Sequence, residues 1–492
     1  MKEYVEKYYY KEPENTKPLF NIPKTKIVAT VGPACDTYDK LLELVKTGVN
    51  VFRLNFSHGD HASKLDIINH IRLINKEHNT FITILADLQG PKLRVGDLEN
   101  GHLNIVPGDE LVFNSREKVV GTKQKIYVSY PDLHKDVRVG EKILLDDGKI
   151  EVLVTEVNHK TGDVKVRVNF GGTLLPKKGV NLPDTNISLP AMTEKDIEDL
   201  DFITEHKLDW VALSFVRNPN DIMELRQRIR KKKSSTKVMA KIEMPSALKY
   251  LDEIIAESDA IMVARGDLGV ELPIEKVPMT QRRIIRQCLI ASKPVIVATQ
   301  MMESMMERTR PNRSEITDVA NAVLEGTDAV MLSGETAMGN HPALVVETMR
   351  NIILEVENTE YYYNRPESHE DRVISDALCY SACNIASEIH AKAIIGMTQS
   401  GYTAFCLSSF RPKRPLFIFT KTESLVTQLG LSWGVKAFYY NDEEGLDEII
   451  EDQLTILKRY KFIKNGDIVV NTGSTPVAKH LPTNMIKITR VE

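Results

Sequence analysis

Short runs of apolar, often β-branched residues alternate with amphipathic helical stretches along the first 340 residues of the chain. Continuous apolar runs are typical of strands buried on both faces of a parallel sheet, and their alternation with helices predicts βαβ units. Eight such runs predict a (β/α)8 TIM barrel. They are Lys26–Gly32, Val51–Ser57, Ile82–Asp87, Trp210–Val216, Val238–Glu243, Ala260–Asp267, Pro294–Gln300 and Ala329–Thr336.

Polar residues at the ends of these runs are the second regularity. Nearly every run ends in side chains able to bind ligands, including Arg53, Asn55, Asp87, Glu243 and Thr299. In a TIM barrel the carboxyl ends of all strands meet at one mouth, where they build the active site. A doubly wound sheet would instead gather ligand groups at one switch point. The spread of polar ends over all the runs therefore favours the barrel.

Two other segments have a different pattern. About a hundred residues between the third and fourth runs alternate polar and apolar positions, as in Lys125–Val128 and Lys142–Val157, which predicts a small all-β insertion. Such a unit could close over the barrel mouth and exclude water. Beyond residue 360 helices and strands alternate again, which predicts an α/β domain. Its expected strands are Ala393–Thr398, Leu416–Thr420, Val435–Tyr440, Asp467–Thr472 and Met485–Val491.

The chain of 492 residues is too long for one ordinary core. We expect an N-terminal extension over residues 1–20 and a catalytic barrel over 21–91 and 190–359. We expect the inserted β lid over 92–189 and a regulatory α/β domain over 360–492.

Composition excludes several classes of protein. With 64 basic and 68 acidic residues the formal charge is -4, which does not suggest a nucleic-acid-binding surface. Five cysteines without metal-type spacing are typical of a reducing compartment. Neither a signal-peptide pattern nor an apolar run long enough to span a bilayer is evident. The sequence thus predicts a cytoplasmic protein that binds neither nucleic acid nor membranes.

One lysine and two carboxylates stand at the ends of successive predicted strands. Lys241 and Glu243 end the fifth run, and Asp267 ends the sixth. Carboxylate oxygens suit Mg²⁺, which keeps positions open for substrate oxygens, and the lysine adds a charge that needs no coordination. Phosphoryl transfer requires these parts. The alternative is a structural ion-pair network at the barrel rim, but the place of this trio among strand ends favours function.

Four motifs carry a resemblance to a known family. They are Lys241-Ile-Glu243, Met262-Val-Ala-Arg-Gly-Asp-Leu-Gly269, Ala298-Thr-Gln-Met-Met-Glu-Ser-Met305 and Met331-Leu-Ser-Gly-Glu-Thr336. With these in order, the chain closely resembles pyruvate kinase over nearly its whole length. The resemblance implies that phosphoenolpyruvate passes its phosphoryl group to ADP, giving ATP, and that the resulting enolate is protonated to pyruvate in the last step of glycolysis.

The resemblance also implies roles for residues at the barrel mouth. Arg53 would clamp the phosphoryl group, and Lys241 would stabilise charge on that group and on the enolate oxygen. Glu243 and Asp267 would hold Mg²⁺, for which Mn²⁺ can substitute. Matching positions for contacts to ADP or ATP are Thr30, Pro33, Asn55, His58, Arg94 and Lys178.

The substrate carboxylate and the proton have their own implied residues. The backbone N–H groups of Arg265, Gly266 and Asp267 would receive the carboxylate, with Thr299 completing the contact. Thr299 and Ser333 stand where the family places its proton relay, which would act through water.

The third strand end departs from the pattern of potassium-activated relatives. Leu88, Gln89, Lys92 and Val95 stand where those relatives commonly carry Thr, Lys, Glu and Thr, so the chain resembles the potassium-independent group. Lys92 would then supply the charge that K⁺ gives its relatives, and no K⁺ would be required. The alternative interpretation is that Lys92 is an ordinary exposed lysine in a loop. The cation region would comprise Asn55, Ser57, Asp87 and Ser214 together with Lys92.

One loop of the predicted C-terminal domain suggests regulation. Thr398, Ser400, Gly401 and Thr403 follow a strand and open a helix, and in the family this loop belongs to the effector site. Its hydroxyl and N–H groups could bind a phosphorylated effector, or could simply cap the helix. The resemblance further implies a homotetramer.

Two rival functions remain open at this point. A barrel lyase or aldolase could use the same metal and lysine to stabilise an enolate, although Arg94 and Lys178 on the nucleotide side speak against it. A catalytically silent metabolite sensor is the other. Its sequence signature would be the loss of a site residue such as Arg53 or Lys241, and both are present.

Overall fold

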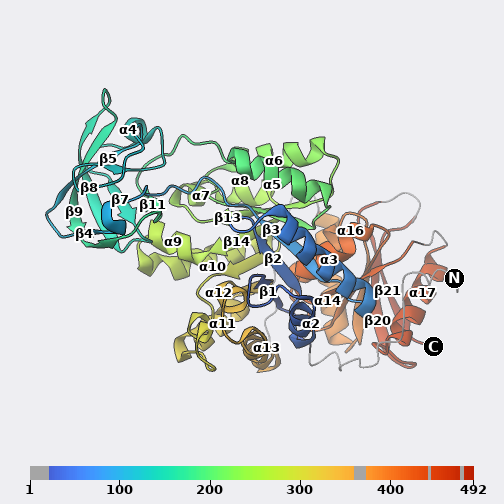
Figure 1. Ribbon diagram of the computed structural model, residues 1–492. Helices are drawn as coiled ribbons and strands as arrows, with labels where there is room; N and C mark the ends of the chain where they lie inside the picture. The colour runs from blue at the N-terminus through green and yellow to red at the C-terminus, as the bar shows by residue number, and fades with distance from the viewer. Residues whose placement is uncertain (1–21, 360–372, 442–444, 477–480) are drawn as a thin grey trace.

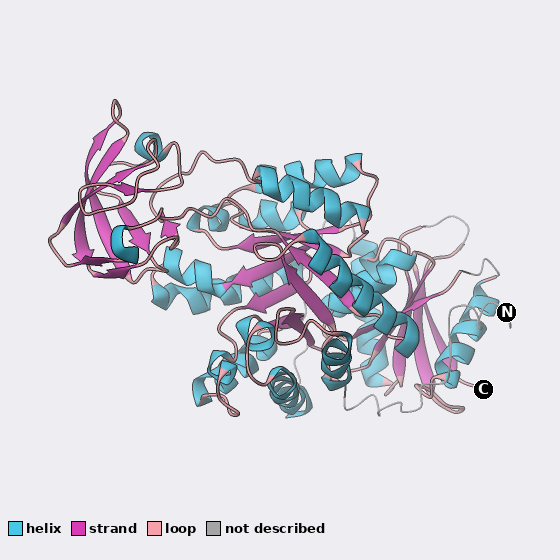
Figure 2. Cartoon of the chain, in the orientation of Figure 1, coloured by secondary structure: helices cyan, strands magenta, loops and turns pink. Residues whose placement is uncertain are grey.

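The computed structural model describes residues 22–359, 373–441, 445–476 and 481–492 and contains three structural units (Figure 1). A closed barrel lies in the centre, an inserted β unit lies on one side of it, and a C-terminal α/β unit lies on the other (Figure 2). The predicted fold class is therefore confirmed. The expected N-terminal extension, residues 1–20, lies outside the described residues.

The barrel is built from eight parallel strands that close on themselves in the order β1-β16-β15-β14-β13-β12-β3-β2. Each strand matches one of the eight predicted runs. Most runs reach one to three residues past the strand, because their polar ends belong to the loops at the mouth. The strands are β1 Lys26–Thr30, β2 Val51–Asn55, β3 Thr83–Asp87, β12 Trp210–Leu213, β13 Lys237–Ile242, β14 Ala260–Ala264, β15 Val295–Ala298 and β16 Ala329–Leu332.

Helices surround the barrel and bury its outer face. Alternate strand residues point inward, where Val28, Leu85, Trp210 and Met239 fill the interior, and outward, where they meet the helices. The surrounding helices are α2 Tyr38–Thr47, α3 His61–His78, α5 Glu194–Glu205, α6 Pro219–Lys231, α7 Pro245–Lys249, α8 Leu251–Glu257, α9 Arg265–Glu271, α10 Val277–Ile290, α11 Arg313–Leu324, α12 Gly334–Ala337 and α13 Pro342–Thr359.

The inserted unit contains a six-stranded sheet, ordered β11-β7-β8-β9-β5-β6, and the pair β10-β4. Its buried aliphatic residues form a core of their own. The predicted run Lys142–Val157 divides into two strands at Asp146 and Asp147, which both adopt positive φ. The elements are β4 Leu103–Ile105, β5 Glu110–Asn114, β6 Ile126–Tyr127, α4 Leu133–Asp136, β7 Lys142–Leu145, β8 Ile150–Asn158, β9 Asp163–Phe170, β10 Gly172–Leu174 and β11 Val180–Asn181.

The C-terminal unit is a five-stranded sheet, ordered β19-β18-β17-β20-β21, with a hydrophobic core on each face. Only the last strand runs antiparallel to its neighbour. The elements are α14 Val373–Glu388, β17 Ala393–Met397, α15 Tyr402–Ser409, β18 Leu416–Thr420, α16 Glu423–Gln428, β19 Val435–Tyr439, α17 Leu446–Arg459, β20 Ile468–Gly473 and β21 Met485–Arg490. Among the described residues, no helix combines the length and apolar character needed to cross a membrane.

The C-terminal unit packs against the end of the barrel opposite the mouth. Trp210 Nε1 donates to the carbonyl of Gln428 at 3.1 Å. Nearby, Asp209 accepts hydrogen bonds from the Ile84 N–H at 2.8 Å and from the Thr427 hydroxyl. Burial raises the pKa of Asp209 from 3.8 to about 6, although these hydrogen bonds favour the ionised form. The contact between barrel and C-terminal unit thus contains a carboxylate that is costly to ionise.

We expect Asp209 to make stability depend on pH. Its pKa is higher in the folded protein than in the unfolded chain, so its ionisation above pH 6 costs stability, at most about 3 kcal/mol, and the cost disappears as the pH falls below 4. The free energy of unfolding of Asp209→Asn and of the wild type can be measured by chemical denaturation at two pH values. The value for Asp209→Asn minus the value for the wild type should be larger at pH 7.5 than at pH 5. The exposed Asp252→Asn on α8 is the control. An equal difference at both pH values for Asp209→Asn would contradict this account.

Candidate active site

Lys241 is the centre of a buried cluster of charges at the barrel mouth. It lies near the end of β13 and is 9% exposed. Its Nζ lies 2.7 Å from Ser214 Oγ, 3.2 Å from Asp87 Oδ1 and 3.0 Å from Glu243 Oε1. These partners follow or end β12, β3 and β13, so the parallel strand ends bring residues more than a hundred positions apart into contact.

The carboxylates hold this lysine in its charged form. Burial by itself lowers the pKa of Lys241, but Asp87 and Glu243 outweigh it and raise the pKa above its usual value. Burial likewise raises the pKa of Asp87, and the nearby Lys241 and Arg53 reverse that effect and hold it below its ordinary value. The mouth therefore contains a fixed ammonium that stays protonated at neutral pH.

Arg53 adds a second cation beside the first. Its Nε donates to Asp87 Oδ2 at 2.7 Å, and its Nη1 donates to Thr30 Oγ1 at 3.0 Å. The Thr30 hydroxyl in turn donates to the carbonyl of Leu332 at 2.9 Å, which joins β1 to β16. The guanidinium is thus oriented by two neighbours, an arrangement suited to fork-shaped binding of a phosphoryl group.

Glu243 and Asp267 are the carboxylates available to a divalent metal. Glu243 is 1% exposed, and its Oε2 accepts the Phe215 N–H at 2.7 Å. Burial raises the pKa of Glu243, the charge of Asp267 raises it further, and Lys241 opposes both. Two hard carboxylates whose charges repel one another are a suitable pair for Mg²⁺. No group of three metal-binding side chains occurs among the described residues, so other ligands would come from substrate and water.

Thr299 and Gly266 contact each other where the segments after β14 and β15 meet. The Gly266 N–H donates to Thr299 Oγ1 at 2.8 Å, and a β-carbon at Gly266 would lie 3.3 Å from that oxygen. Thr299 itself adopts a φ of +70°, a conformation rare for a β-branched residue. The Arg265 side chain donates to the Thr299 carbonyl at 2.7 Å and to Asp318 at 2.6 Å. Arg265 therefore fixes the loop after β15, and the Gly266 N–H would have to exchange its bond to Thr299 Oγ1 for one to a ligand.

Ser333, at the end of β16, has a buried hydroxyl without a hydrogen-bond partner among the described residues. Its N–H donates to Glu335 at 2.7 Å, and Glu335 also accepts the Met302 N–H at 3.1 Å. Glu335 and Asp318 were missed by the sequence reasoning as residues that hold the mouth together. Glu335 lies inside the motif Met331–Thr336, where an acidic residue directly after a predicted strand was the available signal, whereas Asp318 lies outside the four motifs.

The residues expected on the nucleotide side are more dispersed. Pro33 and His58 are exposed. On the β unit, Arg94 Nη1 donates to the Lys177 carbonyl at 3.0 Å, and Lys178 Nζ lies 2.8 Å from Asp146 Oδ1. These two lid residues are therefore occupied by contacts within their own unit, while Thr30 lies in the charged cluster.

Lys92 lies at the junction of the β unit and the barrel. Its Nζ is 3.6 Å from Asp267 Oδ1. Asn55 Oδ1 accepts the Ser57 N–H at 3.0 Å, and Ser214 Oγ lies 3.5 Å from Asp87 Oδ1. The ammonium that contacts Asp87 and Ser214 is that of Lys241, whereas Lys92 adds its charge on the Asp267 side.

The loop before α15 has its hydroxyl groups engaged locally. Thr398 Oγ1 accepts the Gly401 N–H at 3.0 Å, and Ser400 Oγ accepts the Tyr402 N–H at 3.4 Å. Thr403 Oγ1 lies 2.8 Å from Thr483 Oγ1. The contacts are compatible with both interpretations of this loop, as a helix cap and as a phosphate-binding loop, and do not distinguish between them.

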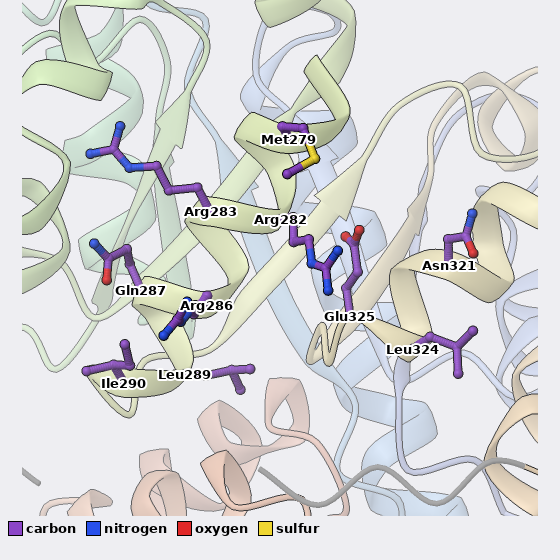
Figure 3. Close-up of a pocket in the computed structure, with 10 residues that line it drawn as sticks. All are labelled: Met279, Arg282, Arg283, Arg286, Gln287, Leu289, Ile290, Asn321, Leu324 and Glu325. Carbon is purple, nitrogen blue, oxygen red and sulfur yellow. The ribbon is translucent and has the colours of Figure 1, made fainter. Parts of the chain in front are cut away.

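A cavity of about 870 Å³ lies away from these strand ends, between α10 and α11. Its lining includes arginines of α10, Asn321 of α11 and Glu325 directly after α11 (Figure 3). It shares no residue with the charged cluster, so volume alone does not identify the catalytic site.

Comparisons with known proteins agree with this geometry. A family model described as "Pyruvate kinase, barrel domain" matches residues 22–346, and one described as "Pyruvate kinase, alpha/beta domain" matches residues 376–489. Pyruvate kinases of Staphylococcus aureus strains MRSA252 and USA300 are each 40% identical over 469 residues, which cover 94% of this chain and 80% of the relative.

A solved structure has the same fold. The crystal structure of a pyruvate kinase from Cryptosporidium parvum superposes with a TM-score of 0.89 at 35% identity, covering 96% of this chain and 97% of that one. The two family models, the curated relatives and this structure agree over nearly the whole length, and the chain belongs to the pyruvate kinase family.

Proposed function

We propose that this chain transfers the phosphoryl group of phosphoenolpyruvate to ADP, giving pyruvate and ATP, with Mg²⁺ or Mn²⁺ as the divalent metal. The observation that carries the proposal is the charged cluster at the mouth, in which Lys241 contacts Asp87, Ser214 and Glu243. Its position at the strand ends is where barrel enzymes bind substrate. The assay that tests it is formation of both products from phosphoenolpyruvate and ADP.

The transferring phosphoryl group would lie against Arg53 and Lys241. Arg53 presents a guanidinium oriented by Asp87 and Thr30, so it loses little freedom on binding. Lys241 is held protonated and directed to the same place, where negative charge develops on the phosphoryl group and on the enolate oxygen. A charge placed in advance stabilises the transition state without reorganisation.

Glu243 and Asp267 would hold the metal. When bound, the divalent ion would neutralise charge on the substrate phosphate and carboxylate oxygens. The charges of the two carboxylates repel each other, and a bound divalent cation would relieve that repulsion, which supports this assignment.

The other end of phosphoenolpyruvate would bind at the turn that opens α9. The N–H groups of Gly266 and Asp267 would receive its carboxylate, with the Gly266 N–H exchanging its present bond to Thr299 Oγ1 for one to the substrate, and the Thr299 hydroxyl would complete the contact. Thr299 and the Ser333 hydroxyl, which has no hydrogen-bond partner in the described part of the chain, would then order the water that protonates the enolate carbon.

The nucleotide would bind between the barrel mouth and the β unit, near Thr30, Pro33, Asn55, His58, Arg94 and Lys178. Arg94 and Lys178 would exchange their present partners within the β unit for phosphate oxygens as the lid approaches. Failure to bind ADP would favour the lyase or aldolase alternative instead.

Lys92 would replace the monovalent cation of potassium-activated relatives. Its ammonium lies 3.6 Å from Asp267 Oδ1, so it would add a fixed positive charge on the metal side of the mouth. Together with Lys241, which contacts Asp87 and Ser214, Lys92 would make K⁺ unnecessary in the region of Asn55, Ser57, Asp87 and Ser214.

We expect wild-type activity to be equal with and without K⁺ at constant ionic strength. In Lys92→Glu the internal charge is reversed, so activity without K⁺ should fall at least about tenfold and recover in part when K⁺ is added. The control is Lys118→Glu, an exposed position on the β unit. A Lys92→Glu variant without potassium dependence would count against this role.

Regulation and assembly follow from family membership as proposals. A phosphorylated effector would bind the loop of Thr398, Ser400, Gly401 and Thr403, and the protein would work as a cytoplasmic homotetramer. Titration with a phosphorylated metabolite and sedimentation analysis test these two points separately.

A further inference from the structure

The short loop of residues 56–60 joins β2 to α3 and carries Ser57 and His58, two of the residues proposed at the barrel mouth. The loop belongs to neither a strand nor a helix. A side chain on such a segment keeps a fixed position only where other groups hold the backbone. At the start of the loop the Phe56 N–H donates to the Asp87 carbonyl at 2.9 Å, which ties the loop to the end of β3.

Two lysine side chains from different helices bind the carbonyl groups of this loop. Lys195 Nζ, from the first turn of α5, donates to the Phe56 carbonyl at 2.8 Å. Lys64 Nζ, from α3, donates to the His58 carbonyl at 2.8 Å. Lys64 is 7% exposed, and its ammonium lies 5.0 Å from the centre of the Phe56 ring. Hydrogen bonds from charged donors are stronger than those from neutral ones, so both ends of the loop are held firmly.

Asp199 of α5 holds the two helices and Lys195 together. This carboxylate is 2% exposed, its Oδ2 lies 2.5 Å from Lys195 Nζ, and its Oδ1 lies 2.7 Å from His61 Nε2. The His61 ring, at the start of α3, stacks on Phe202 of α5 with ring centres 4.4 Å apart. Burial lowers the pKa of Lys64, and the charge of Asp199 opposes that effect. The lysines therefore belong to one connected polar cluster behind the loop.

We propose that Lys64 and Lys195 are positioning residues for the nucleotide, which act by holding the backbone on either side of His58 where ADP would bind. This inference rests on the function proposed above. The phosphoenolpyruvate side should not need them, because Arg53 lies on β2 itself and its guanidinium is oriented by Asp87. The two lysines would thus act on one substrate and leave the other unaffected.

A purely structural role for these lysines predicts a different result. The helices α3 and α5 already pack on the barrel through buried apolar residues such as Ile68, Ile71 and Leu200. If the lysines only added to that packing, their loss would lower stability without a selective effect on ADP. The ratio between the effects on the two substrates therefore distinguishes positioning from packing.

Steady-state kinetics with each substrate varied in turn test the proposal. The Lys195 side chain is 48% exposed, so Lys195→Met should fold, and it should raise KM for ADP about tenfold while KM for phosphoenolpyruvate and kcat stay within about twofold. Lys195→Arg keeps a charged donor and should stay within about threefold of the wild type for ADP. Lys64→Met should also raise KM for ADP about tenfold. Lys76→Met, an exposed lysine on the same helix as Lys64, is the control and should change neither KM.

Calorimetric binding of ADP with Mg²⁺ gives a second readout that does not depend on turnover. Affinity should fall about tenfold in Lys195→Met and Lys64→Met and not in Lys76→Met. An active wild type whose lysine variants keep their KM for ADP, or lose both substrates equally, would overturn this inference alone. Should Lys64→Met fail to fold, the two Lys195 variants decide. A wild type that neither binds ADP nor forms ATP would overturn the proposed function together with this inference.

Discussion

Replacing Lys241 by methionine is expected to lower kcat about a thousandfold, roughly 4 kcal/mol of transition-state stabilisation. The substitution keeps much of the side-chain volume but removes the ammonium that contacts Asp87, Ser214 and Glu243. KM for phosphoenolpyruvate should change much less, because the charge is needed most where negative charge develops during transfer. Steady-state kinetics of pyruvate formation measure both quantities.

Lys237 offers a matched control on the same strand. It begins β13 at the opposite end of the barrel, where its Nζ lies 3.9 Å from Asp259. Lys237→Met removes the same charge from the same strand and should retain kcat within about twofold. If the two variants lost activity equally, the effect would be one of folding or of net charge, and the role of Lys241 would be refuted.

Glu243→Gln is expected to produce the second largest loss. It removes one of two proposed metal ligands and leaves Lys241 with one carboxylate fewer, so half-maximal activity should need at least tenfold more Mg²⁺ and the rate at saturation should fall about a hundredfold. A metal titration of the rate, supported by calorimetric Mn²⁺ binding, separates the two effects. The Mn²⁺ readout does not depend on turnover.

The exposed Glu253→Gln on α8 controls for loss of one negative charge. It should leave the metal dependence unchanged. An unaltered Mn²⁺ affinity in Glu243→Gln would show that Glu243 is only a partner of Lys241, and the metal site would then have to be sought elsewhere.

The barrel could be predicted from sequence because its strands are buried on both faces. Strand segments such as Trp210–Leu213 are continuously apolar, and this pattern can be recognised in the sequence without knowing which strands are neighbours. The carboxyl ends of the strands were predicted less well. Phe215, for example, belongs to a loop, where it adopts a φ of +56° and donates its N–H to Glu243. Apolar character alone does not distinguish a strand residue from a loop residue that packs at the mouth.

The candidate site was predictable in its residues but not in its contacts. Parallel strands put Lys241, Asp87 and Arg53 at one rim, so their proximity followed from the fold. That Lys92 would lie beside Asp267, or that Arg265 would fix the Thr299 loop, depends on side-chain geometry. Motif order contains no such geometric information.

The most direct test of the central claim is the stoichiometry of products from phosphoenolpyruvate and ADP. With Mg²⁺ present, purified protein should form pyruvate and ATP in equal amounts, and a chelator should abolish both. Correctly folded protein that forms neither product, or that releases pyruvate without ATP, would contradict phosphoryl transfer to ADP as the function of the charged cluster around Lys241.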